Sequence, residues 1–243
     1  MVINVEDHKI ALDGALNVRD LGGYPTEGGG ITKTGVFLRS DSLHNLTEAD
    51  ISALKSLGVT MQVDLRSTNE VLSKPSKLLG IEGIAYYHVS FLDNVQSSGF
   101  SNMPNSMAEM YCGLLDSSRE KYAKTFRAFL ANQGSCIFNC TAGKDRTGMV
   151  AMCLLKLADV KDTTIIADYS VSAANLTAAM ALQKIQLEQA GYRLPDYIFD
   201  SDPKDMEITL DYLNQKYGGA IGYLSFCGLT RIEIEQLRRR MIV

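Results

Sequence analysis

The chain has 243 residues, of which 46% are hydrophobic and 21% are charged, and its formal net charge is −4. This length is sufficient for a sizeable core, and we expect a single domain over residues 1–243. An acidic chain produces no bulk positive field, so we expect no nucleic-acid partner, and any anionic ligand must be captured by a local site.

The first ten residues, MVINVEDHKI, lack the basic leader and apolar run of a signal peptide. No uninterrupted apolar run approaches the roughly 18 residues of a membrane-spanning helix, so integral membrane association is not expected. We expect a cytoplasmic protein, or an exported mature form from which a signal peptide has been removed. Five cysteines and three scattered histidines match no zinc or disulfide pattern, so we expect no metal and no cofactor.

In the first half of the chain, short apolar stretches alternate with a helical pattern. A glycine-rich turn over 24–35 is followed by strands expected at 36–40, 60–67 and 84–91. Apolar residues at helical spacing predict a helix over 46–59. A polar loop over 92–108 and a helix over 109–132 follow.

The second half begins with a short buried strand at 135–139 and a helix at 147–160 that is apolar on nearly every face. Further helices are expected at 162–191, 202–217 and 230–241. Their apolar residues, among them Ile165, Leu176, Met180 and Leu182, are expected to pack in the core. Strands separated by helices indicate an α/β fold with a central mixed or parallel sheet, flanked by helices, and a helical C-terminal part.

The junction between the strand at 135–139 and the next helix reads NCTAGKDRTG, residues 139–148. A strand, a loop and a helix in this order direct backbone N–H groups at a common centre, where the helix N-terminus adds partial positive charge. Gly143 permits a tight turn. Such a cradle binds a tetrahedral oxyanion, and phosphate is the commonest one.

Cys140 stands at the start of this cradle. Nearby amides, a helix dipole and a cation favour the thiolate form of a cysteine. The planar guanidinium of Arg146 matches two phosphate oxygens. We therefore expect the Cys140 thiolate to attack phosphorus and form a phosphocysteine that water cleaves, with Thr147 donating a hydrogen bond to the departing sulfur.

The spacing from Cys140 to Arg146 matches the Cys-x-x-x-x-x-Arg signature of protein tyrosine phosphatases. The longer string resembles a bacterial tyrosine/lipid phosphatase family whose loop reads His-Cys-x-x-Gly-Lys-Asp-Arg-Thr-Gly. The resemblance implies a phosphatase-type α/β fold, a cysteine mechanism without metal, and activity on phosphotyrosine, sometimes phosphoserine, phosphothreonine or phosphoinositides. The expected partner is thus a phosphorylated protein or a phosphoinositide. Segments similar to the family lie at 17–24, 37–43, 63–67, 165–172 and 222–230.

Transferred to this sequence, the resemblance makes Cys140 the nucleophile and Arg146 the phosphate clamp. The general acid stays open between Asp145, inside the loop, and Asp93, at the start of the 92–108 loop. The charge of one loop residue, Lys144, is expected where a second phosphate of an inositol ring would lie. The residues expected to surround the phosphate are Thr141, Ala142, Gly143, Lys144 and Thr147.

Asn139 departs from the family, which has histidine before the nucleophile. Asparagine can hydrogen-bond the backbone but cannot carry charge, so we expect a working loop that holds the thiolate less strongly. The alternative is a phosphate-binding pseudophosphatase with little turnover. Asp64 and Arg66 are expected to form a structural ion pair. The sequence does not predict an oligomeric state.

Overall fold

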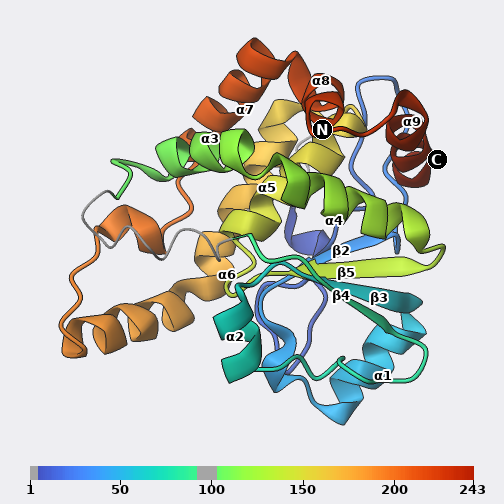
Figure 1. The fold of residues 1–243 in the computed structure, drawn as a ribbon. Coiled ribbons are helices and arrows are strands. Elements are labelled where there is room, and N and C mark those ends of the chain that lie inside the picture. The colour runs from blue at the N-terminus through green and yellow to red at the C-terminus, as the bar shows by residue number, and fades with distance from the viewer. Residues whose placement is uncertain (1–4, 92–102) are drawn as a thin grey trace.

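The computed structural model describes residues 5–91 and 103–243. A five-stranded sheet in the order β1-β2-β5-β3-β4 lies at its centre, with helices on both faces (Figure 1). The β1–β2 pair is antiparallel and the other three pairs are parallel, which confirms the expected mixed sheet. The strands are β1 Arg19–Asp20, β2 Phe37–Ser40, β3 Val59–Asp64, β4 Ala85–His88 and β5 Ser135–Asn139.

Successive side chains of the central strands point to opposite faces of the sheet and so supply two cores. In β5, Cys136 and Phe138 join the larger core, formed with the helices on one face, while Ile137 joins the smaller core on the other. Ile51 and Leu54 of helix α1 belong to the smaller core. The two cores explain why β5 reads as a continuous apolar run instead of an alternating one.

Four of the helices, α2, α3, α4 and α8, differ from the sequence-based expectation. The helix predicted over 109–132 is two helices that meet at Ser118, whose φ of −110° and ψ of 19° are not helical. Consecutive serines favour such a break, because their hydroxyls compete for backbone hydrogen bonds. The short helices α2 and α8 were not predicted. The helices are α1 Glu48–Ser56, α2 Thr68–Ser73, α3 Met107–Ser117, α4 Arg119–Ala131, α5 Asp145–Leu157, α6 Asp162–Gln189, α7 Pro203–Tyr217, α8 Gly219–Phe226 and α9 Arg231–Met241, with short 3₁₀ helices at Val5–His8, Leu43–Asn45 and Asp196–Phe199.

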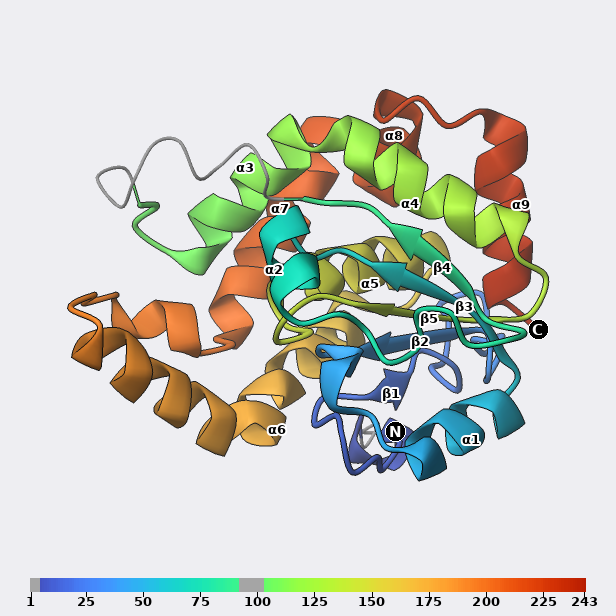
Figure 2. The ribbon, with the colours of Figure 1, turned by 60° about the horizontal axis from the view of Figure 1, so that its bottom comes forward.

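Helix α6 leads away from the sheet, and the chain returns through the 3₁₀ helix Asp196–Phe199 (Figures 1 and 2). Its first half packs in the core, where Ile165 and Leu176 are buried, but Leu182 is 56% exposed, so the core position expected for Leu182 is wrong. By length and composition the helix could cross a membrane, with a mean hydropathy of 1.3 in an 18-residue window that is 28% buried. One helix of this kind is weak evidence, and the expectation of no integral membrane association stays a prediction.

The carboxyl ends of three parallel strands lie side by side at one edge of the sheet. Asn139 at the end of β5 pairs with Ser40 of β2 on one side and with Asp64 of β3 on the other. The loops that leave these strands therefore meet, and the 139–148 motif lies in the middle of them.

Candidate active site

The loop between β5 and α5 has its carbonyl groups held from outside. The oxygen of Cys140 accepts a hydrogen bond from the Asn139 side chain at 3.2 Å. The next three carbonyls accept hydrogen bonds from other parts of the chain. The donors are Ser42 N for Thr141 at 3.0 Å, Asn17 Nδ2 for Ala142 at 3.0 Å and Arg39 Nη2 for Gly143 at 2.7 Å.

This arrangement fixes the direction of the loop amides. In a trans peptide the N–H of one residue points away from the carbonyl of the residue before it. With four successive carbonyls turned outward, the N–H groups of the four following residues turn to the inside of the loop. Within residues 5–91 and 103–243, none of these four N–H groups donates to another backbone carbonyl. The four residues are Thr141, Ala142, Gly143 and Lys144.

Gly143 is the one loop position where only glycine fits. Its φ is +67°, and a Cβ atom there would lie 2.4 Å from the carbonyl oxygen of Ser40. A side chain would therefore push the loop away from the strand that holds it.

Cys140 and Arg146 lie together at the base of the loop. Cys140 is 1% exposed and Arg146 is 8% exposed. Burial disfavours the guanidinium charge, but the negative charges of Cys140 and Glu70 raise the pKa of Arg146 above its usual value. The arginine thus stays a cation at the base of the loop.

Glu70 pairs with Arg146 at two points, with Nη1 to Oε2 at 2.8 Å and Nη2 to Oε1 at 3.1 Å. It also accepts hydrogen bonds from the Thr141 hydroxyl and from the Ser67 N–H. Burial opposes its charge, but the contacts with Arg146 and Thr141 hold the pKa of Glu70 well below its usual range. A carboxylate therefore contacts the guanidinium that we expected to bind phosphate.

Sequence reasoning missed Glu70. It is the third residue of α2, and it forms a capping box with Ser67. The Ser-x-x-Glu pattern at 67–70 is a signal for a helix start, and it directly follows β3. That pattern would have predicted α2, although it carries no sign of the contact with Arg146.

Asp145 begins α5 and lies in the pocket above the loop. Its Oδ1 accepts a hydrogen bond from the Tyr111 hydroxyl at 2.6 Å and lies 3.3 Å from Lys144 Nζ. In the described part of the chain, its Oδ2 has no hydrogen-bond partner. Within the described residues, the carboxyl group is therefore held through one oxygen. Asp93, the other candidate acid, lies outside the described residues.

Lys144 lines the same pocket but does not present a free charge. Its Nζ donates hydrogen bonds to the carbonyl oxygens of Ile198 at 2.7 Å and Asp200 at 2.6 Å. We expected the Lys144 charge to lie where a second phosphate would bind. In the structure, the lysine instead connects the loop to the segment that follows α6. The Thr147 hydroxyl is buried and has no hydrogen-bond partner in the described part of the chain, so it makes no bond to the Cys140 sulfur here.

Asn139 is fully buried in a chain of polar side chains beneath the loop. Its Oδ1 accepts a hydrogen bond from Gln62 Nε2 at 2.8 Å, and Gln62 Oε1 accepts one from Ser76 at 2.7 Å. Its Nδ2 faces Asp64 at 3.4 Å in addition to the Cys140 carbonyl. Asp64 forms the expected buried ion pair with Arg66, at 2.6 Å. Asn139 is thus a neutral link that orients the loop.

A second buried ionic group supports the loop from α6. The Asp168 carboxylate pairs with Arg19 at 2.8 Å and with Arg39, which in turn holds the Gly143 carbonyl. Burial alone would raise the pKa of Asp168, but the two arginines lower it to about 2. The group links α6, β1 and β2 to the loop between β5 and α5.

The pocket above the loop has a volume of about 160 Å³. Its floor is polar and includes Thr141, Asp145 and Arg146. Its walls are mostly apolar and come from α6 and the segment after it. The apolar wall residues are Met180, Leu187, Leu194, Ile198 and Phe199. Among the described residues, no group of three or more histidine, cysteine, aspartate or glutamate side chains is placed to hold a metal ion.

Comparisons with known proteins show what the chain is similar to. A family model described as "Tyrosine phosphatase family" matches residues 10–243. A "Tyrosine-protein phosphatase" of Nostoc commune is 31% identical over 84% of this chain and 74% of its own length. The "Triple specificity protein phosphatase PtpB" of Mycobacterium tuberculosis is 24% identical over 93% of this chain and 96% of its own length. A crystal structure of P. aeruginosa TpbA in complex with pTyr aligns with 91% of this chain, and the alignment includes 96% of the TpbA chain. The sequence identity is 12% and the TM-score is 0.43, a level that establishes no functional relationship.

Proposed function

Because the chain belongs to the tyrosine phosphatase family, we propose that it hydrolyses phosphotyrosine in proteins through a phosphocysteine on Cys140. The single observation that supports this most strongly is the loop of four outward-turned carbonyls above a buried cysteine and arginine. Inward-pointing amides bind the oxygens of a phosphate group, and Arg146 adds a charged fork.

In the first step, the Cys140 thiolate attacks phosphorus, an S–P bond forms and the ester P–O bond breaks. The leaving phenolate oxygen takes a proton from the Asp145 carboxyl, whose Oδ2 has no partner in the described part of the chain. In the second step, water attacks phosphorus, gives its proton to Asp145 and releases inorganic phosphate and the thiolate. The amides and Arg146 stabilise the phosphoryl oxygens in both transition states.

The pocket favours one phosphorylated side chain over a larger head group. Its volume of about 160 Å³ is below the roughly 300–1,000 Å³ of pockets that enclose small-molecule ligands. Its apolar walls, among them Met180 and Phe199, suit an aromatic ring, and the Lys144 charge is already engaged by two carbonyls. We therefore place phosphotyrosine ahead of phosphoserine, phosphothreonine and phosphoinositides as substrate.

A substrate panel tests this proposal. Purified protein in excess EDTA should release phosphate from a phosphotyrosine peptide faster than from phosphoserine peptides or phosphoinositides, and Cys140→Ser should abolish release. Acid-quenched wild-type enzyme should carry phosphate on Cys140. Turnover that requires added metal and survives Cys140→Ser would refute the mechanism.

The alternative function is a phosphate-binding module with little turnover. Two observations favour it: Asn139 stands where the resembling family has histidine, and the Glu70 carboxylate already contacts Arg146. Such a module would bind phosphotyrosine peptides tightly with negligible phosphate release, and Asn139→His would raise the rate. If wild-type protein turns over readily and Asn139→His gives no gain, this alternative is removed.

A further inference from the structure

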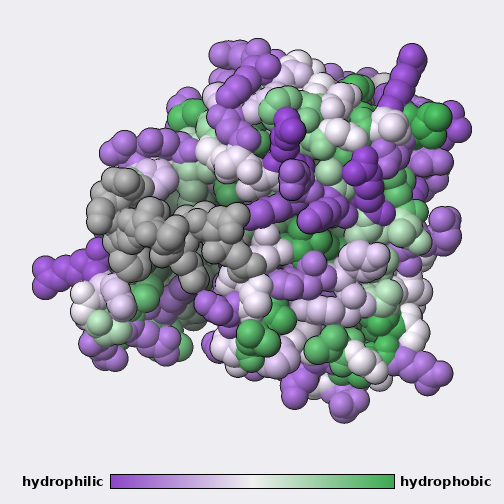
Figure 3. All heavy atoms as spheres, viewed as in Figure 1, coloured by the Kyte–Doolittle hydropathy of each residue, from purple (hydrophilic) through white to green (hydrophobic). Residues whose placement is uncertain are grey.

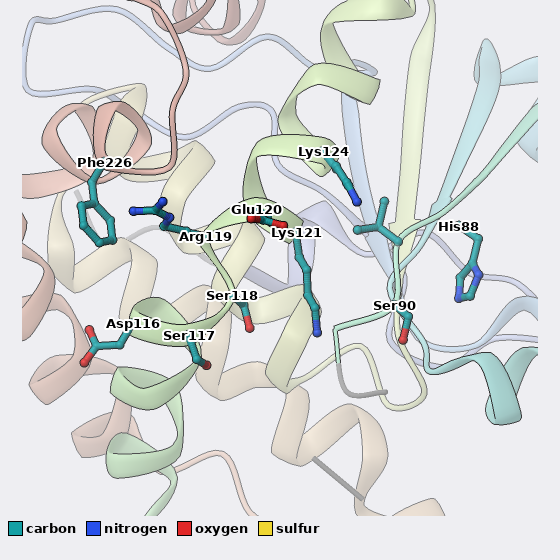
Figure 4. Close-up of a pocket in the computed structure, with 11 residues that line it drawn as sticks. His88, Ser90, Asp116, Ser117, Ser118, Arg119, Glu120, Lys121, Lys124 and Phe226 are labelled. Carbon is teal, nitrogen blue, oxygen red and sulfur yellow. The ribbon is translucent and has the colours of Figure 1, made fainter. Parts of the chain in front are cut away.

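A second cavity, of about 730 Å³, lies beside the first turn of α4 (Figure 4). We call it the α4 cavity, and none of its lining residues belongs to the catalytic loop. Figure 4 shows Lys121 and Lys124 extending from α4 toward Ser90 and His88, with Arg119 beside Phe226. The residues named here and Ser118, at the start of α4, line the cavity.

Three cations face the α4 cavity in a chain whose net charge is −4. The Arg119 guanidinium lies over the Phe226 ring, 5.3 Å from its centre. Lys121 Nζ donates to the Phe91 carbonyl at 2.8 Å. Lys124 has no ion-pair partner among the described residues. The surface over α3 and α4 is correspondingly rich in hydrophilic residues (Figure 3).

Of the residues that the structure describes, two acidic side chains also line the α4 cavity, Asp116 and Glu120. Asp116 accepts hydrogen bonds from Lys216, Tyr212 and Tyr217, so its charge is already compensated from α7. Among the described lining residues, Glu120 is the only remaining negative charge, against the cations of Arg119, Lys121 and Lys124. The balance of charge at the cavity is therefore positive.

The α4 cavity also contains hydroxyl and amide donors without acceptors in the described part of the chain. Ser118 is 4% exposed and its hydroxyl does not cap α4. The Ser90 hydroxyl is buried and has no hydrogen-bond partner within the described residues. In the same part of the chain, the amides of Arg119 and Glu120 at the start of α4 donate to no carbonyl. Buried hydroxyls normally have a partner, and the free amides at the α4 N-terminus favour an anionic one.

The α4 cavity lies on the same edge of the sheet as the catalytic loop. His88 ends β4 and pairs with Asp64, which pairs with Asn139 before the nucleophile. Two strand spacings of about 4.8 Å therefore separate His88 from Asn139, roughly 10 Å. A ligand in the α4 cavity can thus be part of the same substrate molecule that enters the loop.

We propose that the α4 cavity is a second oxyanion site that binds a phosphate group, through Arg119, Lys124, the Ser90 and Ser118 hydroxyls and the first amides of α4. The phosphate is either inorganic phosphate or a second phosphate ester of a phosphoprotein substrate. The site does not depend on catalysis at Cys140.

Backbone NMR with inorganic phosphate as the probe tests the site directly. Amides of Ser118–Glu120 should shift in a saturable way, separately from those of 141–144. Lys124→Glu should raise the dissociation constant at the α4 amides at least fivefold and leave that of the catalytic loop unchanged. The matched control is Lys55→Glu, which makes the same charge change at an exposed position of α1 on the other face of the sheet.

The outcomes separate this proposal from the proposed function. Arg146→Met should remove the shifts in the loop and keep those at α4. No saturable shift at the α4 amides, an equal effect of Lys124→Glu and Lys55→Glu, or loss of both sets of shifts in Arg146→Met would each overturn the proposal, even if the enzyme is an active phosphatase.

A kinetic comparison then identifies the source of the phosphate. Peptides with one phosphotyrosine, with or without a nearby phosphoserine, are compared in wild type and Lys124→Glu. If Lys124→Glu raises KM only for the doubly phosphorylated peptide, the α4 cavity takes a substrate phosphate. If KM is unchanged for both while inorganic phosphate still binds at α4, the free ion is the ligand.

Discussion

Glu70 and Arg146 form a two-point ion pair at the loop between β5 and α5, with N–O distances of 2.8 and 3.1 Å. The pair joins α2 to the loop and neutralises the guanidinium before a substrate arrives. An incoming phosphate has to share Arg146 with this carboxylate, and the two anions repel each other. Glu70 therefore holds the arginine in place at a cost in phosphate affinity.

Glu70→Gln removes the negative charge and keeps the shape of the side chain. We expect inorganic phosphate to bind about 3- to 10-fold tighter, roughly 1 kcal/mol, because one nearby anion is lost. Since the pKa of Glu70 is lowered in the folded chain, the carboxylate stays ionised and the difference should persist from pH 5 to 8. Competitive inhibition by phosphate measures it. Weaker inhibition in the variant would mean that Glu70 acts mainly by orienting Arg146.

Asp145→Asn should identify the general acid. Loss of a positioned acid costs about 10²- to 10⁴-fold in rate when the leaving group needs a proton. We expect a large fall in kcat for phosphotyrosine and a much smaller one for an aryl phosphate whose phenol has a low pKa. Asp93→Asn is the matched control. If Asp93→Asn shows this leaving-group dependence and Asp145→Asn does not, the acid is Asp93.

Gln62→Met tests the buried polar chain beneath the loop. The substitution keeps the length of the side chain but leaves the Asn139 carbonyl oxygen without its donor at 2.8 Å. An unsatisfied buried group costs about 1–3 kcal/mol of unfolding free energy, which urea denaturation measures. We also expect kcat to fall, because Asn139 orients the Cys140 carbonyl. Unchanged stability and kcat would show that this chain does not support the loop.

Asp168→Asn should change the acid stability of the protein. Because the folded pKa of Asp168 is about 2 and the unfolded value is about 3.9, its ionised form stabilises the fold above pH 4. That stabilisation, about 2–3 kcal/mol, is lost as the pH falls from 4 to 2. In Asp168→Asn this pH-dependent part should be absent, and stability at pH 7 should fall by about 3–5 kcal/mol because Arg19 and Arg39 lose their buried partner.

Urea midpoints at several pH values between 2 and 7 measure both effects. The control is Asp211→Asn, an exposed acid on α7. If Asp168→Asn kept the full acid dependence of the wild type, Asp168 would not be its source.

The sequence predicted the parts of this site that are local in the chain. The strand at 135–139, the following loop and the helix after it depend on neighbouring residues, and they were predicted nearly to the residue. The loop string also pointed to Cys140 and Arg146 through its resemblance to a known family. Asp64 and Arg66, two residues apart, were correctly expected to pair.

The parts that the sequence did not predict depend on contacts between distant segments. Glu70 lies 76 residues from Arg146, and Asn17 lies 125 residues from the carbonyl that it holds. From the sequence alone, Lys144 is expected to carry a free charge in the loop. In the structure, the segment after α6 supplies two carbonyl groups that accept hydrogen bonds from it. Met180 and Leu182 have the hydropathy of core residues, but α6 leaves the body of the protein before it reaches them.

The donors that hold the loop carbonyls are spread from residue 17 to residue 139, and one of them, Asn17, lies in the N-terminal segment that precedes β1. The cradle is therefore complete only while the N-terminal segment is docked. Local opening of that segment requires less free energy than melting of the central strands. Catalysis should consequently disappear at a lower urea concentration than the helical circular dichroism signal, with partial denaturation switching the enzyme off while the rest of the molecule stays folded.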